Sequence, residues 1–252
     1  KALSNVTAYM GTPITNQSIF INTARVTDVR IRQALLYGID RQTILDGMVH
    51  GYGEIVDGFL CSSSPYYDEA LGVTAYDPEK ARALIAEAVA DGASNHLEWH
   101  VNSGDTTFTQ AVSFIAAMFQ ELGLDIEIRT ENLDMLMESA GTGDFDVMSV
   151  EYTYMPLDPY TDVSWLLSAD GWTRYNNEEV TNALMQSQAL GADEQDAVKA
   201  CYLNVDQHMQ TDVPVISAYI ISKMGVASNR LMNVKPDVFG TFINVHEWDA
   251  AE

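Results

Sequence analysis

The sequence predicts an α/β fold in which a mainly parallel sheet is flanked by helices. Between residues 97 and 152, three stretches with the apolar pattern of strands alternate with two stretches whose apolar residues recur at helical spacing. Strands separated by helices are normally joined by right-handed crossovers, which place the strands in parallel. With 252 residues, of which 47% are apolar, the chain can bury the core that such a fold needs.

The segments before this unit are predicted to be one strand and two helices. Residues 18–22 are apolar and β-prone, which is typical of a strand. Asp28 can cap a helix whose apolar side continues over residues 29–44. After a loop rich in Ser, Pro and Tyr, Asp77 and Pro78 suit the cap and the first position of the next helix.

The remaining elements follow from the same two periodicities. Strands are expected over residues 97–101, 125–129, 145–152 and 213–222, and helices over residues 107–122, 133–140, 178–190 and 193–209. On the first of these strands Leu97, Trp99 and Val101 alternate with polar residues and should face the core. On the second strand, Ile126 and Ile128 are expected to point inward.

A binding site is predicted after the strand that ends at residue 152. Ligands of parallel sheets bind beyond the carboxyl ends of the strands. Tyr152, Thr153 and Tyr154 stand at this end and could offer a ligand ring faces and hydroxyl groups, or could simply pack the loop. Trp172 and Tyr175 are further candidates, although aromatic residues in long loops often anchor the loop to the core.

The charge and the cysteines narrow the class of protein. A formal net charge of −23 argues against nucleic acid and anionic membrane surfaces as partners, because a field of that sign repels both. No apolar run approaches the ~20 residues of a membrane span. Cys61 and Cys201 lie outside any CxxC motif, so they either pair in an oxidising compartment or stay as buried thiols.

The sequence contains no pattern typical of a catalytic centre. GxSxG, HExxH and Walker-type glycine loops are absent, so we expect a binding protein rather than an enzyme, and no cofactor. His96, Glu98 and His100 could present metal ligands from one face of a strand, but no fourth ligand is near in sequence. A solvent-facing polar strand face is the simpler interpretation, and we predict no metal site.

Short motifs in the first third of the chain carry a family resemblance. They are VRIRQALLYGIDRQTI over residues 29–44, GYG over 51–53, SPYYD over 64–68 and YDPEKA over 76–81. In this order they resemble a stretch of the extracytoplasmic solute-binding proteins that serve peptide and nickel ABC importers. Residues 144–159 and 171–184 are similar to two later blocks of the same family. Arg32, Asp40 and Arg41 recur in the first motif, and their helical placement indicates ion pairs within the fold.

The resemblance implies a lobe of the type II periplasmic-binding-protein fold. Family members have two lobes around a ligand cleft and are considerably longer than this chain, which resembles lobe two with its hinge segments. Residues 1–24 would form a hinge or crossover segment, residues 25–222 the ligand-binding lobe two, and residues 223–252 a return segment towards the missing amino-terminal lobe. The surface that the missing lobe covers should be partly apolar.

The resemblance also implies a function, which is the capture of a ligand outside the membrane and its delivery to the permease subunits of an ABC importer. The expected ligand is an oligopeptide. A nickel chelate or another small solute bound by the same family, and a sensory module that reuses the fold, are the alternatives. The protein would be extracytoplasmic, in the periplasm or on the outer face of the cell membrane, with a lipid anchor on its full-length form.

The same resemblance adds residues to the predicted site. Peptide binders of the family often carry ADYPDP after the third strand, and its first aspartate pairs with the free amino terminus of the ligand. If Asp158 and Pro159 align with the last two letters, that acidic position holds Met155 here. Residues 156–160 also resemble the PYDPH run of nickel-type members, with Tyr160 in place of the histidine. The predicted ligand-binding residues are therefore Tyr152, Thr153, Tyr154, Met155, Asp158, Trp172 and Tyr175.

Overall fold

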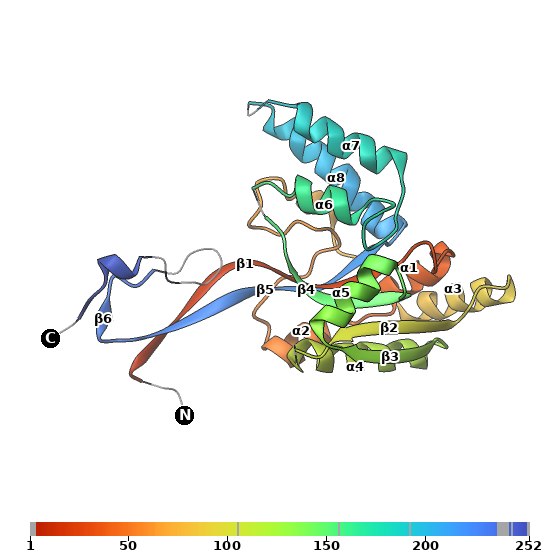
Figure 1. Ribbon diagram of the computed structural model, residues 1–252, viewed down its shortest axis with the longest axis horizontal. Coiled ribbons are helices and arrows are strands. Elements are labelled where there is room, and N and C mark those ends of the chain that lie inside the picture. Colours follow the sequence, from red (N-terminus) through yellow and green to blue (C-terminus); the bar gives the residue numbers. More distant parts are fainter. Residues whose placement is uncertain are drawn as a thin grey trace.

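The structure is a computed structural model that describes residues 4–104, 106–155, 157–191, 193–235, 242 and 244–250. The described residues form one main sheet with the strand order β3-β2-β4-β1-β5 (Figure 1). Its strands are β1 (Val6–Ile21), β2 (His96–Asn102), β3 (Asp125–Glu131), β4 (Val147–Thr153) and β5 (Val215–Ser228). β2 pairs in parallel with β3 and β4, whereas β1 runs antiparallel to β4 and β5. All strands of this sheet except β1 therefore point the same way, which confirms the predicted mainly parallel sheet.

β1 and β5 are much longer than the strands predicted over residues 18–22 and 213–222. Their outer parts, up to Met10 and from Met224 onward, pair with each other as a ribbon that leaves the body of the molecule (Figure 1). In the ribbon the larger apolar residues Met10, Met224 and Val226 are exposed, whereas the small residues Gly225 and Ala227 are buried. The apolar pattern expected of a half-buried strand is therefore absent from its sequence. The predicted lobe limits at residues 24 and 222 stay a prediction.

One face of the sheet is covered by α1 (Val29–Tyr37), α2 (Arg41–Val49), α3 (Pro78–Ala90) and α4 (Thr106–Glu121). Apolar side chains of these helices bury Ile19 of β1 and Trp99 of β2 completely. The indole ring of Trp99 stacks on the ring of Phe119 from α4, with 5.8 Å between the ring centroids. This cluster is the larger of the two main cores that lie against the sheet.

The single helix predicted over residues 29–44 is wrong, because the chain forms α1 and α2 with a break at Gly38. A Cβ atom at Gly38 would lie only 2.5 Å from Cδ1 of Leu122, so the close approach of the α4 end requires glycine there. Asp40 then caps α2 and begins a new helix. Asp77 caps α3 in the same way, as predicted.

The opposite face of the sheet is covered by α5 (Leu133–Thr142), α6 (Tyr160–Leu166), α7 (Glu178–Ala189) and α8 (Gln195–Thr211) (Figure 1). The core on this side contains Phe20, Phe145 and Met148, each with no exposed area. α6 is not among the helices expected from the sequence, because a helix of two turns carries too few apolar positions to show a period. The remaining short elements are η1 (Glu69–Leu71), β6 (Leu231–Met232), η2 (Val245–Glu247) and β7 (Asp249–Ala250).

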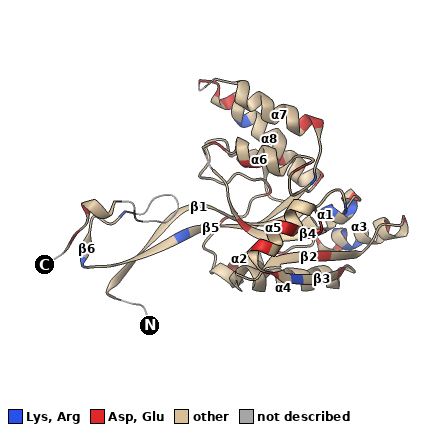
Figure 2. Cartoon of the chain, viewed as in Figure 1, with Lys and Arg blue, Asp and Glu red and all other residues tan. Residues whose placement is uncertain are grey.

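The strand faces differ from the prediction at two positions. Leu97, Trp99 and Val101 are buried as expected, but His100 on the opposite face is also only 2% exposed. Ile128, which was expected to point inward, is 37% exposed because β3 is the edge strand of the sheet. Acidic residues appear on both helical layers and on the sheet, and basic residues are fewer (Figure 2).

A buried ion pair joins the two helical layers. Nη2 of Arg41 in α2 lies 2.5 Å from Oδ1 of Asp57, and the two side chains are 3% and 0% exposed. The other oxygen of Asp57 accepts a hydrogen bond from Nε2 of Gln210 in α8 at 2.9 Å. The ion pair predicted for Arg41 is therefore confirmed, whereas Arg32 donates to backbone carbonyls and Asp40 serves as a helix cap.

Candidate ligand-binding site

The carboxyl ends of β2, β3 and β4 lie on one edge of the sheet, on the side where the β1–β5 ribbon leaves the body (Figure 1). An open groove of about 680 Å³ lies at this edge. It is lined by residues at the strand ends and at the starts of α4 and α5, namely Asn102, Ser103, Gly104, Thr106, Asn132, Leu133, Val150 and Glu151. The groove occupies the place where parallel sheets bind their ligands.

An aromatic cluster follows the groove at the end of β4. The Tyr152 ring lies 4.8 Å from the Tyr154 ring and 5.9 Å from the Trp172 ring, measured between centroids. The Tyr152 hydroxyl donates a hydrogen bond to Oδ1 of Asp162 in α6 at 3.0 Å. The pKa of Tyr152 is raised mainly by its partial burial and, to a smaller extent, by this contact with a carboxylate. Three of the predicted site residues are thus brought together, and Tyr152 links them to α6.

Tyr154 packs the loop in this structure. Its side chain is 4% exposed, and its ring lies edge-on to the Phe59 ring with 5.1 Å between centroids. Its hydroxyl is 3.5 Å from the hydroxyl of Ser18 on β1. Burial raises the pKa of Tyr154, so the phenol is neutral at every physiological pH. These contacts show that Tyr154 packs the loop, and a ligand-binding role for it stays a prediction.

The other predicted residues lie in three different surroundings. Met155 is 45% exposed, and the Thr153 hydroxyl lies 3.5 Å from that of Thr15. Asp158 lines a second hollow, of about 180 Å³, between the loop after β4 and the α7–α8 pair. Tyr175 is 5% exposed and donates its hydroxyl to the Asp212 carboxylate, away from the aromatic cluster. The ligand-binding role of all these residues stays a prediction.

Sequence reasoning did not single out Glu151, although it carries the one charge among the groove-lining residues that the structure describes. Its Oε1 forms an ion pair with Nζ of Lys223 on β5, and its Oε2 accepts a hydrogen bond from Nε2 of Gln17 on β1 at 3.3 Å. One acid at a strand end is not distinctive in a chain with 36 acidic residues. The contacts with Lys223 and Gln17 come from remote parts of the chain, so no local pattern signals them.

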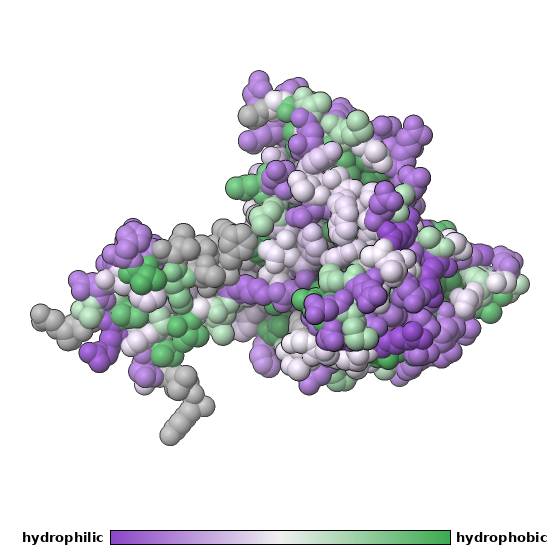
Figure 3. All heavy atoms as spheres, in the orientation of Figure 1, coloured by the Kyte–Doolittle hydropathy of each residue, from purple (hydrophilic) through white to green (hydrophobic). Residues whose placement is uncertain are grey.

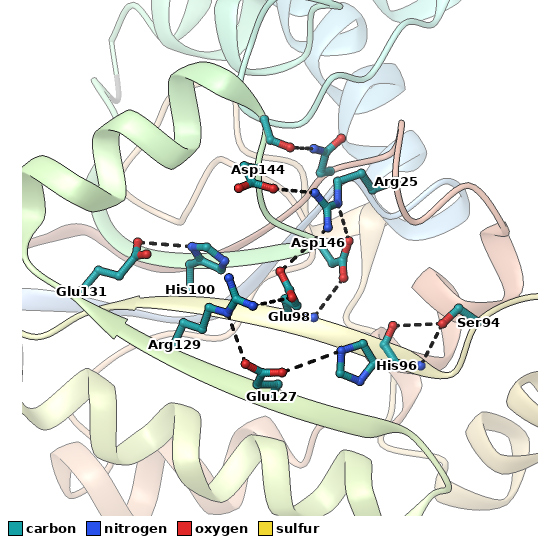
Figure 4. Close-up of polar contacts among 12 residues, drawn as sticks. Arg25, Ser94, His96, Glu98, His100, Glu127, Arg129, Glu131, Asp144 and Asp146 are labelled. Carbon is teal, nitrogen blue, oxygen red and sulfur yellow. Dashed lines mark hydrogen bonds and ion pairs between the residues drawn. The ribbon is translucent and has the colours of Figure 1, made fainter.

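Charged side chains also gather near the other end of β2 (Figure 4). The ligand atoms of His96, Glu98 and Glu127 lie within 4.8 Å of one another. Arg129 donates to Glu98 at 2.6 Å and to Glu127 at 3.3 Å, so its guanidinium already neutralises the carboxylates that a cation would need. The hydrogen bond with the Asp125 carboxylate raises the pKa of His96. The group is an ion-pair network.

His100 does not join this group, contrary to the arrangement considered from the sequence. Its Nδ1 lies 3.2 Å from Oε2 of Glu131, under α5 and towards the carboxyl end of the strand (Figure 4). Cys61 and Cys201 are both buried and do not form a disulfide with each other. Of the two alternatives left open by the sequence, the structure therefore shows buried free thiols. Burial raises the pKa of the Cys61 and Cys201 thiols, which keeps them protonated.

A mainly parallel sheet between two helical layers, with a groove at its carboxyl edge and a two-stranded ribbon leaving beside it, is a fold of the type II periplasmic binding proteins. The chain belongs to the bacterial extracellular solute-binding proteins, family 5, because the family's middle region matches residues 1–174. The predicted family and the predicted fold are thereby confirmed.

Among curated relatives, the chain is similar to the nickel-binding periplasmic protein of Escherichia coli, with 23% identity over 60% of this chain and 32% of the relative. Di/tripeptide-binding protein 1 of Pseudomonas aeruginosa is 26% identical over 56% of this chain and 27% of the relative. These matches span no more than about a third of either relative.

Two solved structures show the same fold over nearly the whole chain. The oligopeptide-binding protein AppA from Bacillus subtilis, in complex with a nonapeptide, gives a TM-score of 0.83 at 18% identity, covering 100% of this chain and 53% of AppA. NikZ from Campylobacter jejuni, in complex with Ni(L-His), gives 0.82 at 19% identity, covering 98% of this chain and 54% of NikZ. The chain therefore spans about half the length of these structures.

Proposed function

We propose that the chain is the second ligand-binding lobe of a longer solute-binding protein, which captures oligopeptides outside the membrane and delivers them to the permease of an ABC importer. The observation that carries the proposal is the position of the groove. It opens at the carboxyl edge of the sheet, beside two strands that run unbroken from the sheet into the ribbon. Continuous strands at the base of a lobe can act as a hinge, and closure over the groove would enclose a ligand.

The ribbon supports the proposal that a second lobe lies next to it. Met10, Met224 and Val226 are 46%, 60% and 51% exposed, and apolar residues gather on the ribbon in Figure 3. Exposed apolar groups of this extent mark surfaces that another part of a protein covers. The proposed division is a hinge segment over residues 1–24, lobe two over 25–222 and a return segment over 223–252.

The lining of the groove favours a peptide over a metal chelate. Amide and hydroxyl side chains make up half of the described residues that line it, and no histidine or cysteine is among them. Such groups pair with the backbone of many different peptides, directly or through water. A nickel chelate or another small solute stays the second candidate, because proteins named for nickel binding and for peptide binding are both among the relatives.

The proposal also states where the full-length protein is located and that it does not convert its solute. None of the helices in the described part of the chain is both long and apolar enough to span a bilayer. The family is one of extracellular solute-binding proteins, and we propose that the full-length protein is held at the membrane by a lipid anchor and binds its solute without converting it. Incubation with peptides that produced cleaved fragments at enzymatic turnover would contradict this part of the proposal.

Native mass spectrometry of the full-length protein, purified without added ligand, tests the function. A heterogeneous set of extra masses in the range of short peptides, lost on denaturation, is expected. A single discrete mass that contains a metal would favour the nickel chelate instead. A bare protein that also fails to retain any member of a tripeptide to pentapeptide library would refute the peptide proposal.

A matched pair of variants locates the site. Ser103 is exposed in the groove, and Gln186 is exposed on α7, outside the groove. Ser103→Trp should fill the groove and abolish retention of peptides, whereas Gln186→Trp adds the same bulk elsewhere and should leave retention unchanged. Equal retention by both variants would place the ligand outside the groove.

A further inference from the structure

The segment that follows α2 contacts both strands at the point where the ribbon leaves the body (Figure 1). We propose that residues 53–63, here called the strap, hold β1 and β5 at this point and confine the bending of the hinge to residues 10–13 and 222–224. The role of the strap rests on the proposed function, because a fixed bending point sets the path along which the lobe would close over the groove. No strap residue is among the described residues that line the groove.

The pairing between β1 and β5 is irregular next to Pro13. The register shifts on both sides of it, between Met10 and Pro13 and between Pro13 and Thr15. Proline has no N–H group to donate to the ladder. From Thr15 inward β1 is also paired with β4, whereas its outer part pairs with β5 alone among the described strands. Bulges bend a strand and interrupt its ladder, so this is where the ribbon should bend relative to the sheet.

The first part of the strap is paired with β5. Glu54 and Ile220 exchange two backbone hydrogen bonds, each 2.8 Å long. A Cβ atom at Gly53 would lie 2.4 Å from the carbonyl oxygen of Ile220, so this close approach requires glycine. The GYG motif of residues 51–53 therefore ends in the residue that lets the strap reach β5.

The last part of the strap holds β1 through the carbonyl oxygen of Pro13. This oxygen accepts hydrogen bonds from the thiol of Cys61 at 2.7 Å and from the hydroxyl of Ser63 at 3.2 Å. Burial raises the pKa of Cys61 and keeps its thiol protonated, so it can act as a donor. Pro13 is thus tied to the lobe by two side chains, although the ladder beside it is irregular.

The middle of the strap is anchored in the lobe. The backbone N–H of Phe59 donates to Oδ1 of Asp206 in α8 at 3.1 Å, and the Phe59 ring packs against Tyr154. A Cβ atom at Gly58 would lie 2.2 Å from Cγ of Asp206, so the strap lies directly on α8. Inward of Pro13 the two strands are therefore held by the lobe, and the outer residues are left to bend.

Hydrogen–deuterium exchange of the full-length protein tests the strap without any ligand. The double variant Cys61→Ala/Ser63→Ala removes both donors to Pro13. The amides of residues 14–17 and 216–221 should then exchange about fivefold faster or more, because two hydrogen bonds no longer oppose local opening. Ser63→Ala alone is the milder change and should shift the same amides in the same direction by less.

Two further variants show that the effect belongs to the strap. Cys61→Ser keeps a donor for Pro13 and should retain the protection of wild type. Ser113→Ala is the matched control, because Ser113 donates to the carbonyl of Thr109 on α4 at 3.0 Å and its loss removes the same kind of bond away from the ribbon. The amides next to the strap should be unchanged in this control. Far-UV circular dichroism checks that every variant is folded.

A mixture of tripeptides, added to the ligand-free protein, tests the bending point. In wild type the exchange of residues 7–12 and 222–226 should change on binding, whereas residues 15–21 and 215–221 should stay as protected as before. The double variant should retain the same peptides about two- to tenfold less well, because a loosened strand pair must be ordered again when the lobe closes.

The outcomes separate the strap from the proposed function. If the double variant exchanges like the Ser113→Ala control, the strap does not hold the strands and the inference fails, whatever the protein binds. If peptides change the exchange of residues 15–21 in wild type, the bend lies inside the lobe and the inference also fails. If wild type retains no tripeptide, the proposed function falls together with the hinge role of the strap, even where the double variant loosens the strands.

Discussion

Asp206 is a buried carboxylate of α8 that opposes the stability of the fold at neutral pH. It is 6% exposed, and its Oδ1 accepts a hydrogen bond from the backbone N–H of Phe59 at 3.1 Å. Burial raises the pKa of Asp206 from 3.8 to about 7, helped by the nearby Asp57 and opposed by the Phe59 hydrogen bond. Replacement by asparagine keeps an acceptor for Phe59 and removes the titrating group.

The sign of the effect follows from linkage. The folded state binds the proton of Asp206 more tightly than the unfolded state, so the stability from this group is complete below the unfolded pKa and is lost as pH rises to about 7. A pKa difference of about three corresponds to about 4 kcal/mol, which is an upper bound for the loss. At pH 8 the Asp206→Asn variant should therefore be more stable than wild type by about 1–4 kcal/mol, and at pH 4 this advantage should disappear.

Urea unfolding of the purified chain at pH 4 and pH 8 measures the difference. The comparison between variant and wild type isolates Asp206 from every other group that titrates in this range. Asp158→Asn is the control, because Asp158 is exposed and its replacement should shift neither curve by more than about 0.5 kcal/mol. A difference between Asp206→Asn and wild type that is the same at both pH values would refute the reasoning.

Three further predictions concern single side chains. Arg41→Met should cost about 3–5 kcal/mol in urea unfolding, because it leaves the Asp57 carboxylate buried without its partner, and a loss below about 1 kcal/mol would contradict this. Trp99→Phe should cost about 2–4 kcal/mol, because the smaller phenyl ring leaves a cavity where the fully buried indole packs and the hydrogen bond from the indole N–H to Ser149 is lost. An unchanged denaturation midpoint would be the contrary result. The pKa of His96, measured by NMR titration, should lie above its usual range and fall in Asp125→Asn. The stabilisation from this contact is present below the pKa of the imidazole in the unfolded chain and is lost as pH rises through its pKa in the folded chain. If the pKa of His96 were the same in Asp125→Asn, the Asp125 carboxylate would not be what raises it.

Local features were predicted well where their cause is local. Asp77 and Pro78 open α3 because a cap and a fixed φ act within one turn of the helix. The need for a small residue at position 38 escaped prediction because it comes from the close approach of Leu122, which is remote in sequence. Ile128 escaped because only the strand order makes β3 an edge strand.

The candidate site also has features that the sequence predicts and features that only the tertiary structure shows. Tyr152 and Tyr154 could be predicted to stand at the end of β4, because a strand's carboxyl end can be recognised from its apolar pattern. The contact of Trp172 with Tyr152 is visible only in the tertiary structure. The burial of Tyr154 could not be predicted, since Phe59 covers it from a distant loop. Whether the predicted residues bind a ligand stays a prediction.

The amino-acid sequence by itself determined the α/β class and the family, because hydrophobic periodicity and short motifs are local properties. It also predicted the edge of the sheet at which a ligand is expected, and that edge stays a prediction. Only the tertiary structure decided that Tyr154 packs the loop, that Arg41 joins α2 to α8, and that the ammonium of Lys223 meets Glu151. These contacts join segments far apart in the chain. The energies of these contacts depend on burial and on distances between side chains, and neither quantity can be read from the order of residues in the sequence.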